Sequence, residues 1–197
     1  MIKELVLATR NQDKGRELAA LLKELGIRIR TLVEFPDAPE VVEDGDTCEA
    51  NAIKKAVTIA RYTKLPAAAD DTGLMVEALG GRPGVHAARY AGDGATYEDN
   101  CRKLLHELAG VPRERRKARF VTVAALADPD GKVEAVQGVL DGLITDAPAG
   151  TQGFGYDPVF FVPELGKTLA QVTPEEKNRI SHRGRAFAKL KVLLNRK

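Results

Sequence analysis

Two adjacent acids mark the place where the sequence most strongly indicates chemistry. Asp70 and Asp71 follow the apolar run 65–69 and precede Thr72, so we expect a short buried strand, 67–69, that ends at the acid pair. In α/β sheets, ligands bind beyond the carboxyl ends of the strands. Neighbouring like charges are unfavourable unless a cation bridges them or one carboxyl stays protonated. The pair therefore predicts a metal site or a proton-transfer role, although a solvated acidic turn would have the same sequence.

A candidate phosphate-binding segment lies between the first expected strand, 5–8, and the helix that follows it. Its residues are Thr9, Arg10, Asn11, Gln12, Asp13 and Lys14. The free N–H groups and the positive dipole end of a helix N-terminus suit phosphate, and a flexible lysine can follow a phosphate chain. Because the segment lacks the glycines of a Walker loop, a simple helix cap with a solvated lysine is the alternative.

The acidic stretch 43–46 supplies further carboxylates, and two polar residues follow it on an expected helix. Asn51 and Lys55 are four positions apart and share a helix face. Carboxylate oxygens without nearby His or Cys suit a hard ion such as Mg²⁺, which also binds phosphate oxygens. We therefore expect Glu43 to join Asp70 and Asp71, with a surface acidic loop as the alternative.

Two later segments have the residue types of a base-binding pocket. Glycines flank Phe154 in the run Gly153–Pro158, which leaves its ring free to lie against a planar ligand. Phe154 and Tyr156 could equally fill the core beneath a loop. Lys177 and the run Ser181–Gly184 are rich in hydrogen-bond donors that could bind a ring carbonyl or phosphate. A basic surface turn is the alternative there.

The elements that position these residues alternate between strand and helix in the first half of the chain. Leucines at helical spacing after Lys14 predict a helix that Gly26 ends, followed by a strand at 27–32. Asp46 is the expected cap of the next helix, with Glu49 at its third position. The run 80–84, rich in glycine, predicts a loop, and Thr96 is the expected cap of a further helix.

The second half predicts a hairpin and two C-terminal helices. Strands at 120–127 and 133–140 flank the turn 128–131, and 159–162 is a further short strand. Thr173, Pro174 and Glu176 form a complete helix start, and Phe187 belongs to the apolar stripe of the last helix. We expect an α/β fold, a mixed β-sheet with flanking helices, over one domain at 1–197 that is divided into two lobes.

Composition indicates an ordinary globular protein. Of 197 residues, 44% are hydrophobic and 29% are charged, and the net charge of +2 is too small to favour nucleic acid or membrane partners. The basic run 113–117 is interpreted as a solvated loop. Cys48 and Cys101 match no metal spacing and are expected to be reduced. With neither a signal peptide nor a membrane span in the sequence, we expect a cytoplasmic location.

Six motifs occur in order and cover nearly the whole chain. They are TRNQDK (9–14), EDGDTCEANAIKKA (43–56), ADDTGL (69–74), GGRPGVHAARY (80–90), AGTQGFGYDPVF (149–160) and KNRISHRG (177–184). Together they resemble the inosine/xanthosine triphosphate pyrophosphatase family. The resemblance implies an elongated mixed α/β fold with two lobes around a central substrate cleft, a homodimer and a Mg²⁺ cofactor. It also implies hydrolysis of ITP, dITP or XTP to the monophosphate and pyrophosphate.

The resemblance also implies roles for individual residues. Its phosphate loop falls on Thr9–Lys14 and its helix lysine on Lys55. Its metal ligands fall on Glu43 and Asp71, and Asp71 matches the proton acceptor. Thr72 matches a substrate contact. The base pocket matches Phe154, Gly155, Tyr156, Asp157, Lys177, His182 and Arg183. Ala50 departs from the glutamate usual in the family, so Glu43 must supply more of the metal binding.

These roles form a plausible mechanism. Asp71 or Asp70 would deprotonate the attacking water, with their pairing raising one pKa, and Lys14 and Lys55 would stabilise charge on the phosphates. Three other classes remain open: a septum-site nucleotide pyrophosphatase, which would lack the SHRG motif; a nucleotide-binding module without catalysis, which would lack the acids; and a nucleic-acid binder, which would need a wider basic surface.

Overall fold

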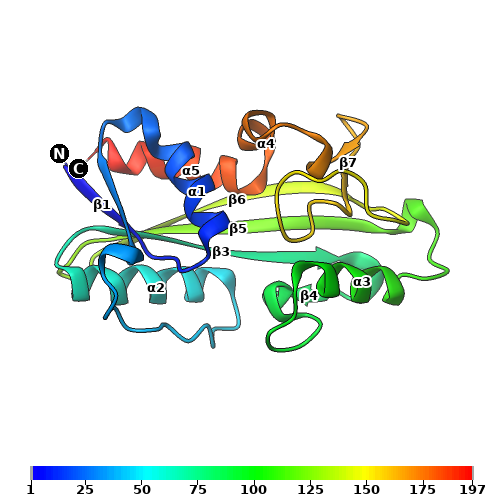
Figure 1. Cartoon of the computed structure of the whole chain (residues 1–197), viewed down its shortest axis with the longest axis horizontal. Coiled ribbons are helices and arrows are strands. Elements are labelled where there is room, and N and C mark those ends of the chain that lie inside the picture. The colour runs from blue at the N-terminus through cyan, green and yellow to red at the C-terminus, as the bar shows by residue number, and fades with distance from the viewer. Residues whose placement is uncertain (1, 197) are drawn as a thin grey trace. The chain divides into compact units, whose positions relative to one another are not determined.

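The computed structural model describes residues 2–196. It is an α/β structure with an eight-stranded mixed sheet in the order β2-β1-β3-β5-β6-β7-β8, with β4 paired to β3, and helices flank the sheet (Figure 1). The fold class predicted from the sequence is therefore confirmed. The chain divides into two compact units. The first contains the described residues up to Asp71, Thr122–Gly138 and those from His182 onward; the second contains Thr72–Val121 and Val139–Ser181.

The strands are β1 (Glu4–Leu7), β2 (Arg28–Thr31), β3 (Ala67–Val76), β4 (Pro83–Gly84), β5 (Lys117–Ala127), β6 (Val133–Ile144), β7 (Phe160–Val162) and β8 (Lys167–Thr168). The helices are α1 (Gln12–Leu22), α2 (Cys48–Thr63), α3 (Tyr97–Glu107), α4 (Pro174–Ile180) and α5 (His182–Leu194).

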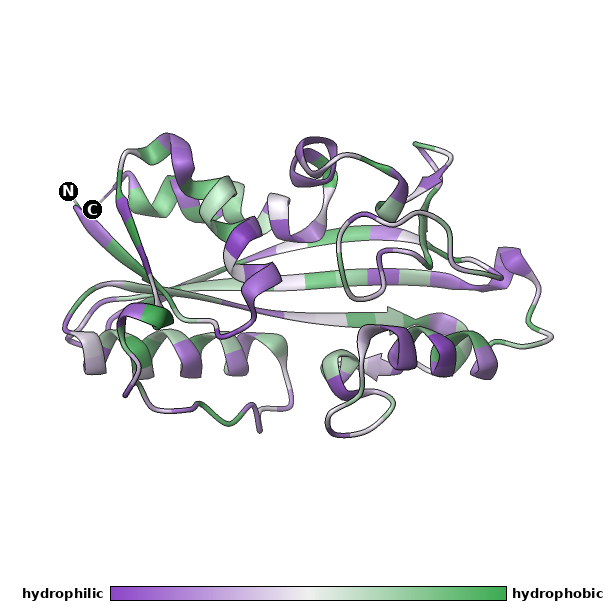
Figure 2. Cartoon of the chain, viewed as in Figure 1, coloured by the Kyte–Doolittle hydropathy of each residue, from purple (hydrophilic) through white to green (hydrophobic). Residues whose placement is uncertain are grey.

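In the first unit, β1 pairs in parallel with both β2 and β3, and Leu7 lies opposite Ala68. Helices α1 and α5 cover one face of these strands and α2 covers the other (Figure 1). Leu5, Leu18 and Phe187 belong to the buried core beneath α1 and α5. Burying both faces of parallel strands requires apolar runs such as that of β1, and Figure 2 shows β1 passing from purple to green along its length.

In the second unit, α3 and α4 lie on opposite faces of the strands (Figure 1). Its core contains Leu104, Phe120, Phe160 and Tyr156. The expected loop at 80–84 is partly wrong, because Pro83–Gly84 forms β4, antiparallel to β3. The expected hairpin is confirmed: β5 and β6 are neighbours in the sheet, and Asp128 N donates to Lys132 O at 2.9 Å across the turn.

Threonine hydroxyls cap three of the helices. Thr96 caps α3 and Thr173 caps α4, as predicted, and in each case the acid three residues later makes a reciprocal contact. The expected cap at Asp46 is wrong. Thr47 is the N-cap of α2, and its hydroxyl accepts from Ala50 N at 3.1 Å. Either side chain could cap a helix, and the backbone places Thr47 in the extended conformation that a cap requires.

Strand β3 differs most from its sequence prediction. The expected strand at 67–69 extends to Val76, so Asp70 and Asp71 lie in its middle rather than beyond its end. The reason is visible on both sides of the acids: Ala68 is part of the first core, and Leu74 is part of the second. The strand continues through the charged positions because both acids have cationic partners.

The cysteine and basic-run predictions have different outcomes. Both cysteines are buried and free of disulfides, as expected, and burial raises the pKa of Cys48 to about 12 and of Cys101 to about 11. The interpretation of 113–117 as a solvated loop is wrong for Arg116, which is buried and donates to three backbone carbonyls. Among the described residues no helix is long and apolar enough to cross a membrane.

Gly138 of β6 lies against the start of α5 more closely than any side chain would allow. A Cβ atom there would stand 2.1 Å from His182 O and 2.4 Å from Ala186 N. Since both are backbone atoms, Gly138→Ala must push α5 away, and we expect the free energy of unfolding to fall by about 3 kcal/mol, measured by chemical denaturation. As a control, Gly15→Ala in α1 would place its Cβ 3.9 Å from Thr9 and should stabilise the helix by up to about 1 kcal/mol. Equal stability of the two variants would contradict the prediction.

Candidate functional site

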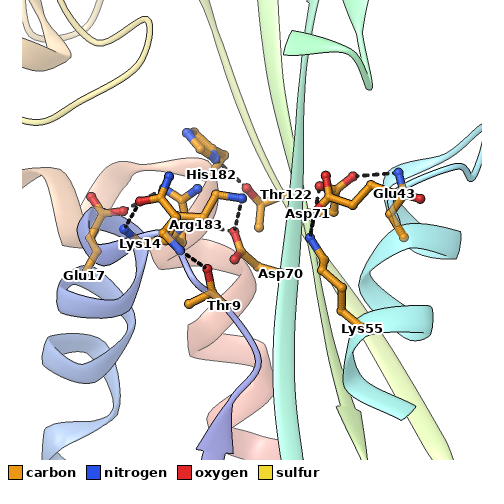
Figure 3. Close-up of polar contacts among 12 residues, drawn as sticks. Thr9, Lys14, Glu17, Glu43, Lys55, Asp70, Asp71, Thr122, His182 and Arg183 are labelled. Atoms are coloured by element: carbon orange, nitrogen blue, oxygen red, sulfur yellow. Dashed lines mark hydrogen bonds and ion pairs between the residues drawn. The ribbon is translucent and has the colours of Figure 1, made fainter. Parts of the chain in front are cut away.

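Asp70 and Asp71 point to opposite faces of the sheet. Successive side chains of a strand alternate between its faces, and Figure 3 shows Asp70 on the side of Lys14 and Arg183, and Asp71 on the side of Lys55 and Glu43. The two carboxylates, adjacent in the sequence, therefore do not lie side by side. Their closest cationic partners form two charged clusters, and the charge of Lys55 acts on both acids.

The first cluster surrounds Asp70. Its Oδ2 accepts from Arg183 Nε at 3.1 Å and lies 3.7 Å from Lys14 Nζ. Arg183 also donates to Glu17 Oε2 at 2.6 Å. Lys14 and Glu17 belong to α1, and Arg183 belongs to α5. Each of the two helices that cover this face therefore forms an ion pair with Asp70 of β3. The sequence predicts Arg183 in the base pocket; the structure instead engages its guanidinium with these acids.

The charge state of Asp70 also differs from expectation. Burial would raise the pKa of this carboxyl, but the charges of Lys14, Arg183 and Lys55 outweigh burial and lower its pKa below the usual range. The expected rise through pairing with Asp71 is therefore wrong for Asp70. A carboxylate that is held ionised and contacts two cations is a poor proton acceptor. The geometry therefore indicates that Asp70 positions Lys14 and Arg183.

The second cluster surrounds Asp71 on the face covered by α2. Lys55 Nζ lies 3.4 Å from Asp71 Oδ1 and 2.5 Å from Glu43 Oε1. Asn51 Nδ2 donates to Asp71 Oδ2 at 3.3 Å, and Asn51 Oδ1 accepts from Gly45 N at 2.8 Å. The helix face shared by Asn51 and Lys55 was predicted from their spacing and is confirmed. These contacts bring Glu43, Lys55 and Asp71 together as the sequence predicts.

The predicted phosphate segment precedes α1 and begins that helix. Asn11 caps the helix, since its Oδ1 accepts from Lys14 N at 3.1 Å, and Thr9 Oγ1 accepts from Asn11 N at 3.2 Å. Arg10 Nη2 donates to Ala38 O at 2.6 Å. Asp13 forms an ion pair with Arg16, and Gln12 is exposed. The caps hold the helix N-terminus in place and direct Lys14 toward Asp70.

His182 begins α5 and is almost fully buried. Its Nδ1 lies 2.6 Å from the hydroxyl of Thr122 on β5, and Figure 3 shows the rest of the ring extending away from Thr122. Because a hydroxyl can either donate or accept, Thr122 orients the His182 ring without by itself fixing its tautomer.

In the second unit, Phe154, Asp157 and Lys177 form one group. Lys177 Nζ donates to Asp157 Oδ2 at 2.6 Å and lies 4.7 Å from the centroid of the Phe154 ring. The same carboxylate oxygen accepts from Phe154 N at 2.8 Å. Gly153 permits this turn, because a Cβ on it would stand 2.1 Å from Asp157 Oδ2. The three predicted base-pocket residues are thus brought together by a buried ion pair.

The other predicted residues of this unit divide between loop, strand and core. Gly155 has a φ of 64°, which favours glycine, and Thr72 is half-buried on β3. The ring of Tyr156 is in the core and its hydroxyl donates to Ala87 O at 2.8 Å. This position agrees with the alternative that the ring fills the core beneath the loop, and the ligand contact of Tyr156 stays a prediction.

The sequence profile of the Ham1 family matches residues 5–193. The chain belongs to the Ham1 family. The resemblance inferred from the six motifs is thereby confirmed.

Members of the Ham1 family with known names and structures are similar along their whole length. A dITP/XTP pyrophosphatase of Geobacillus kaustophilus is 53% identical over 189 residues, 96% of this chain and 93% of its own. One from Geobacter sulfurreducens is 55% identical over 187 residues, 95% and 94% of the two chains. A HAM1 protein from Coxiella burnetii, 41% identical, superposes with a TM-score of 0.89 over all of both chains. The Staphylococcus aureus Ham1 protein, 40% identical, gives 0.86 over 98% of each.

The donor set of this Ham1 chain fits Mg²⁺. Within residues 2–196 no group of three or more His, Cys, Asp and Glu side chains could enclose a metal. Mg²⁺ does not require a group of three such side chains, since it is usually held by one or two carboxylates, waters and substrate phosphates. Glu43 and Asp71 supply two carboxylates that already converge on one cation, the ammonium of Lys55. The residues present therefore suit Mg²⁺ bound together with a phosphate ligand.

Sequence reasoning about this Ham1 chain missed two partners of the site and undervalued a third. Glu17 lies three residues after Lys14 on α1, and helix spacing could have indicated it. Asn51 was placed on the correct helix face without a role. Thr122 carries no local signal, because its contact with His182 joins residues 60 positions apart.

Proposed function

We propose that this chain hydrolyses the noncanonical purine nucleotides ITP, dITP and XTP to their monophosphates and pyrophosphate with the help of Mg²⁺. The observation that carries the proposal is the convergence of Glu43 and Asp71 on the ammonium of Lys55. It occurs in a chain whose relatives, about half identical over nearly their full length, are named dITP/XTP pyrophosphatases. Such a cluster suits phosphoryl transfer, which needs mainly positioning and charge stabilisation.

The proposed roles follow from the two faces of β3. Glu43 and Asp71 would hold Mg²⁺, which when bound would polarise a phosphoryl oxygen and offset charge on the leaving pyrophosphate. Asp71 would orient and deprotonate the attacking water. Lys14, which Asp70 positions, and the capped start of α1 would bind the phosphates. Asp70 remains a carboxylate throughout, because Lys14 and Arg183 lower its pKa despite its burial.

The base would be recognised by the aromatic ring of Phe154 and by hydrogen-bond donors. Inosine and xanthosine carry a carbonyl at ring position six, where adenosine carries an amino group. Lys177 and His182 can present N–H donors, and donors left unpaired against adenine can disfavour it by about 10⁴-fold. Lys177 is already held by Asp157 beside Phe154, which preorganises the ammonium for this role.

The decisive experiment is a panel of nucleoside triphosphates with Mg²⁺, in which pyrophosphate and orthophosphate release are scored separately. We expect dITP, ITP and XTP to give pyrophosphate and the monophosphate, with far less turnover of ATP. Orthophosphate as the main product, or equal turnover of ATP, would contradict the proposal. Omission of Mg²⁺, with chelator present, should abolish turnover.

His182→Ala is expected to narrow the preference for ITP over ATP by about tenfold, because one donor facing the base is lost. The measurement is the ratio of kcat/KM for the two substrates. His86→Ala is the matched control, since His86 is an exposed histidine whose ring contacts Arg89, and it should leave the ratio unchanged. An unchanged ratio in His182→Ala would assign base discrimination to other residues.

We also propose that the protein works in the cytoplasm as a homodimer on free nucleotides. The free, buried cysteines support the cytoplasmic location, and the net charge of +2 supports free nucleotides over nucleic acid as the substrate. The homodimer rests on the family resemblance. Light scattering coupled to size exclusion would give the mass, which should be twice 21.3 kDa. Salt-sensitive binding to duplex DNA would instead support the nucleic-acid alternative.

A further inference from the structure

The ammonium of Lys55 stands where a divalent cation would have to bind. It lies 2.5 Å from Glu43 Oε1 and 3.4 Å from Asp71 Oδ1, and the side chains of Lys55 and Asp71 are only 11% and 5% exposed. A metal on the same two carboxylates would place two cations against the same oxygens, where they repel. The ammonium and a metal bound to these oxygens therefore compete.

The surroundings of Lys55 allow the ammonium to leave without disordering the two acids. Asp71 is buried on β3 and keeps a second donor, Asn51 Nδ2, at 3.3 Å. Asn51 also holds Gly45, two residues after Glu43, through a contact of 2.8 Å to Gly45 N. A lysine, by contrast, carries its charge on a flexible four-carbon chain. Asp71 and the loop next to Glu43 are therefore held by contacts other than those of the ammonium.

We propose that Lys55 couples the binding of metal to the binding of triphosphate. Without nucleotide, its ammonium neutralises Glu43 and Asp71 in place of the metal; with nucleotide, the triphosphate attracts the ammonium and leaves both carboxylates to the metal. The inference rests on the proposed function, whose metal and substrate it uses. Because such coupling is reciprocal, the metal must strengthen triphosphate binding by the same factor.

The test compares Mn²⁺ binding by the full-length wild-type chain and the Lys55→Met variant, measured by isothermal titration calorimetry. Without nucleotide, the variant should bind Mn²⁺ about tenfold more tightly than wild type, since the competing ammonium is gone. An uncleavable α,β-imido analogue of dITP should strengthen Mn²⁺ binding by wild type by about 10-fold to 100-fold. The variant should lose most of that increase.

The neighbouring lysine is a matched control. Lys54 is on the same helix and carries the same charge, but its ammonium pairs with the exposed Asp44 at 2.6 Å. Lys54→Met should bind Mn²⁺ as wild type does, both with and without the analogue. An equal gain in Lys54→Met would show a general effect of helix charge and would overturn the inference.

Two further variants keep the test decisive. Glu43→Gln added to Lys55→Met should remove the gain in Mn²⁺ affinity, which shows that the gain arises at this carboxylate. Lys55→Gln repeats the experiment with a polar side chain, and cooperative thermal unfolding verifies that each variant folds. Unchanged or weaker Mn²⁺ binding in both Lys55 variants overturns the inference. Pyrophosphate release from dITP by wild type, measured in parallel, tests the proposed function separately.

Discussion

Asp71→Asn is expected to lower kcat for dITP hydrolysis by about 10³-fold, because the amide can neither accept the proton of the attacking water nor hold Mg²⁺ with the charge of a carboxylate. The substitution keeps the size of the side chain on β3. The phosphates would still meet Lys14 and the capped start of α1. Affinity for the α,β-imido analogue of dITP, measured by calorimetry without divalent metal, should therefore change by less than about tenfold.

The control for Asp71→Asn is Asp44→Asn, which changes the acid next to Glu43 in the acidic stretch 43–46. Asp44 is exposed and pairs with Lys54, so its loss should leave kcat within about twofold of wild type. If Asp71→Asn retained wild-type turnover, Asp71 would be removed from the mechanism. If it lost analogue binding as completely as turnover, its role would be in binding rather than in the chemical step.

Asp70→Asn makes the same chemical change as Asp71→Asn at the neighbouring position. We expect it, however, mainly to lower the free energy of unfolding. Asp70 is fully buried and holds Arg183 at 3.1 Å and Lys14 at 3.7 Å. Removing one partner from a buried charge pair leaves the other uncompensated, which costs about 3 to 5 kcal/mol. Chemical denaturation should show this loss in the free energy of unfolding. Turnover should fall as well, because Lys14 loses its anchor.

The stability of the wild type should depend on pH through Asp70 with a defined sign. Its pKa in the folded protein is lowered by Lys14, Arg183 and Lys55, which outweigh the opposing effect of burial. Below the ordinary aspartate pKa of about 3.9, the unfolded chain therefore binds the proton first, and stability falls as pH falls. Above that pH the contribution is complete. In Asp70→Asn, the decline in unfolding free energy below about pH 4 should be shallower.

An exposed pair serves as the reference for Asp70. Asp141 accepts from Arg119 at 2.6 Å, but both side chains are more than half exposed. Asp141→Asn should reduce the free energy of unfolding by less than about 1 kcal/mol. Equal losses in Asp141→Asn and Asp70→Asn would contradict the view that burial makes the Asp70 cluster important.

Local features of the fold were predictable because neighbouring residues decide them. The starts of α3 and α4 follow from threonine caps with an acid three residues later, and the β5–β6 turn follows from the run 128–131. The shared helix face of Asn51 and Lys55 follows from their spacing alone. The family followed from six motifs in order along the chain.

Tertiary structure decided what β3 does with its two acids. The sequence could place Asp70 beside Asp71 but could not show that the strand continues past them, because that depends on cations carried by α1, α2 and α5. Once the strand continues, its pleat separates the two carboxylates onto opposite faces. Arg183, 113 positions from Asp70, and the core position of Tyr156 likewise follow from long-range packing. The side chains of Arg183 and Tyr156 are chemically suited to several environments, and the tertiary contacts of the folded chain determine which environment each one occupies.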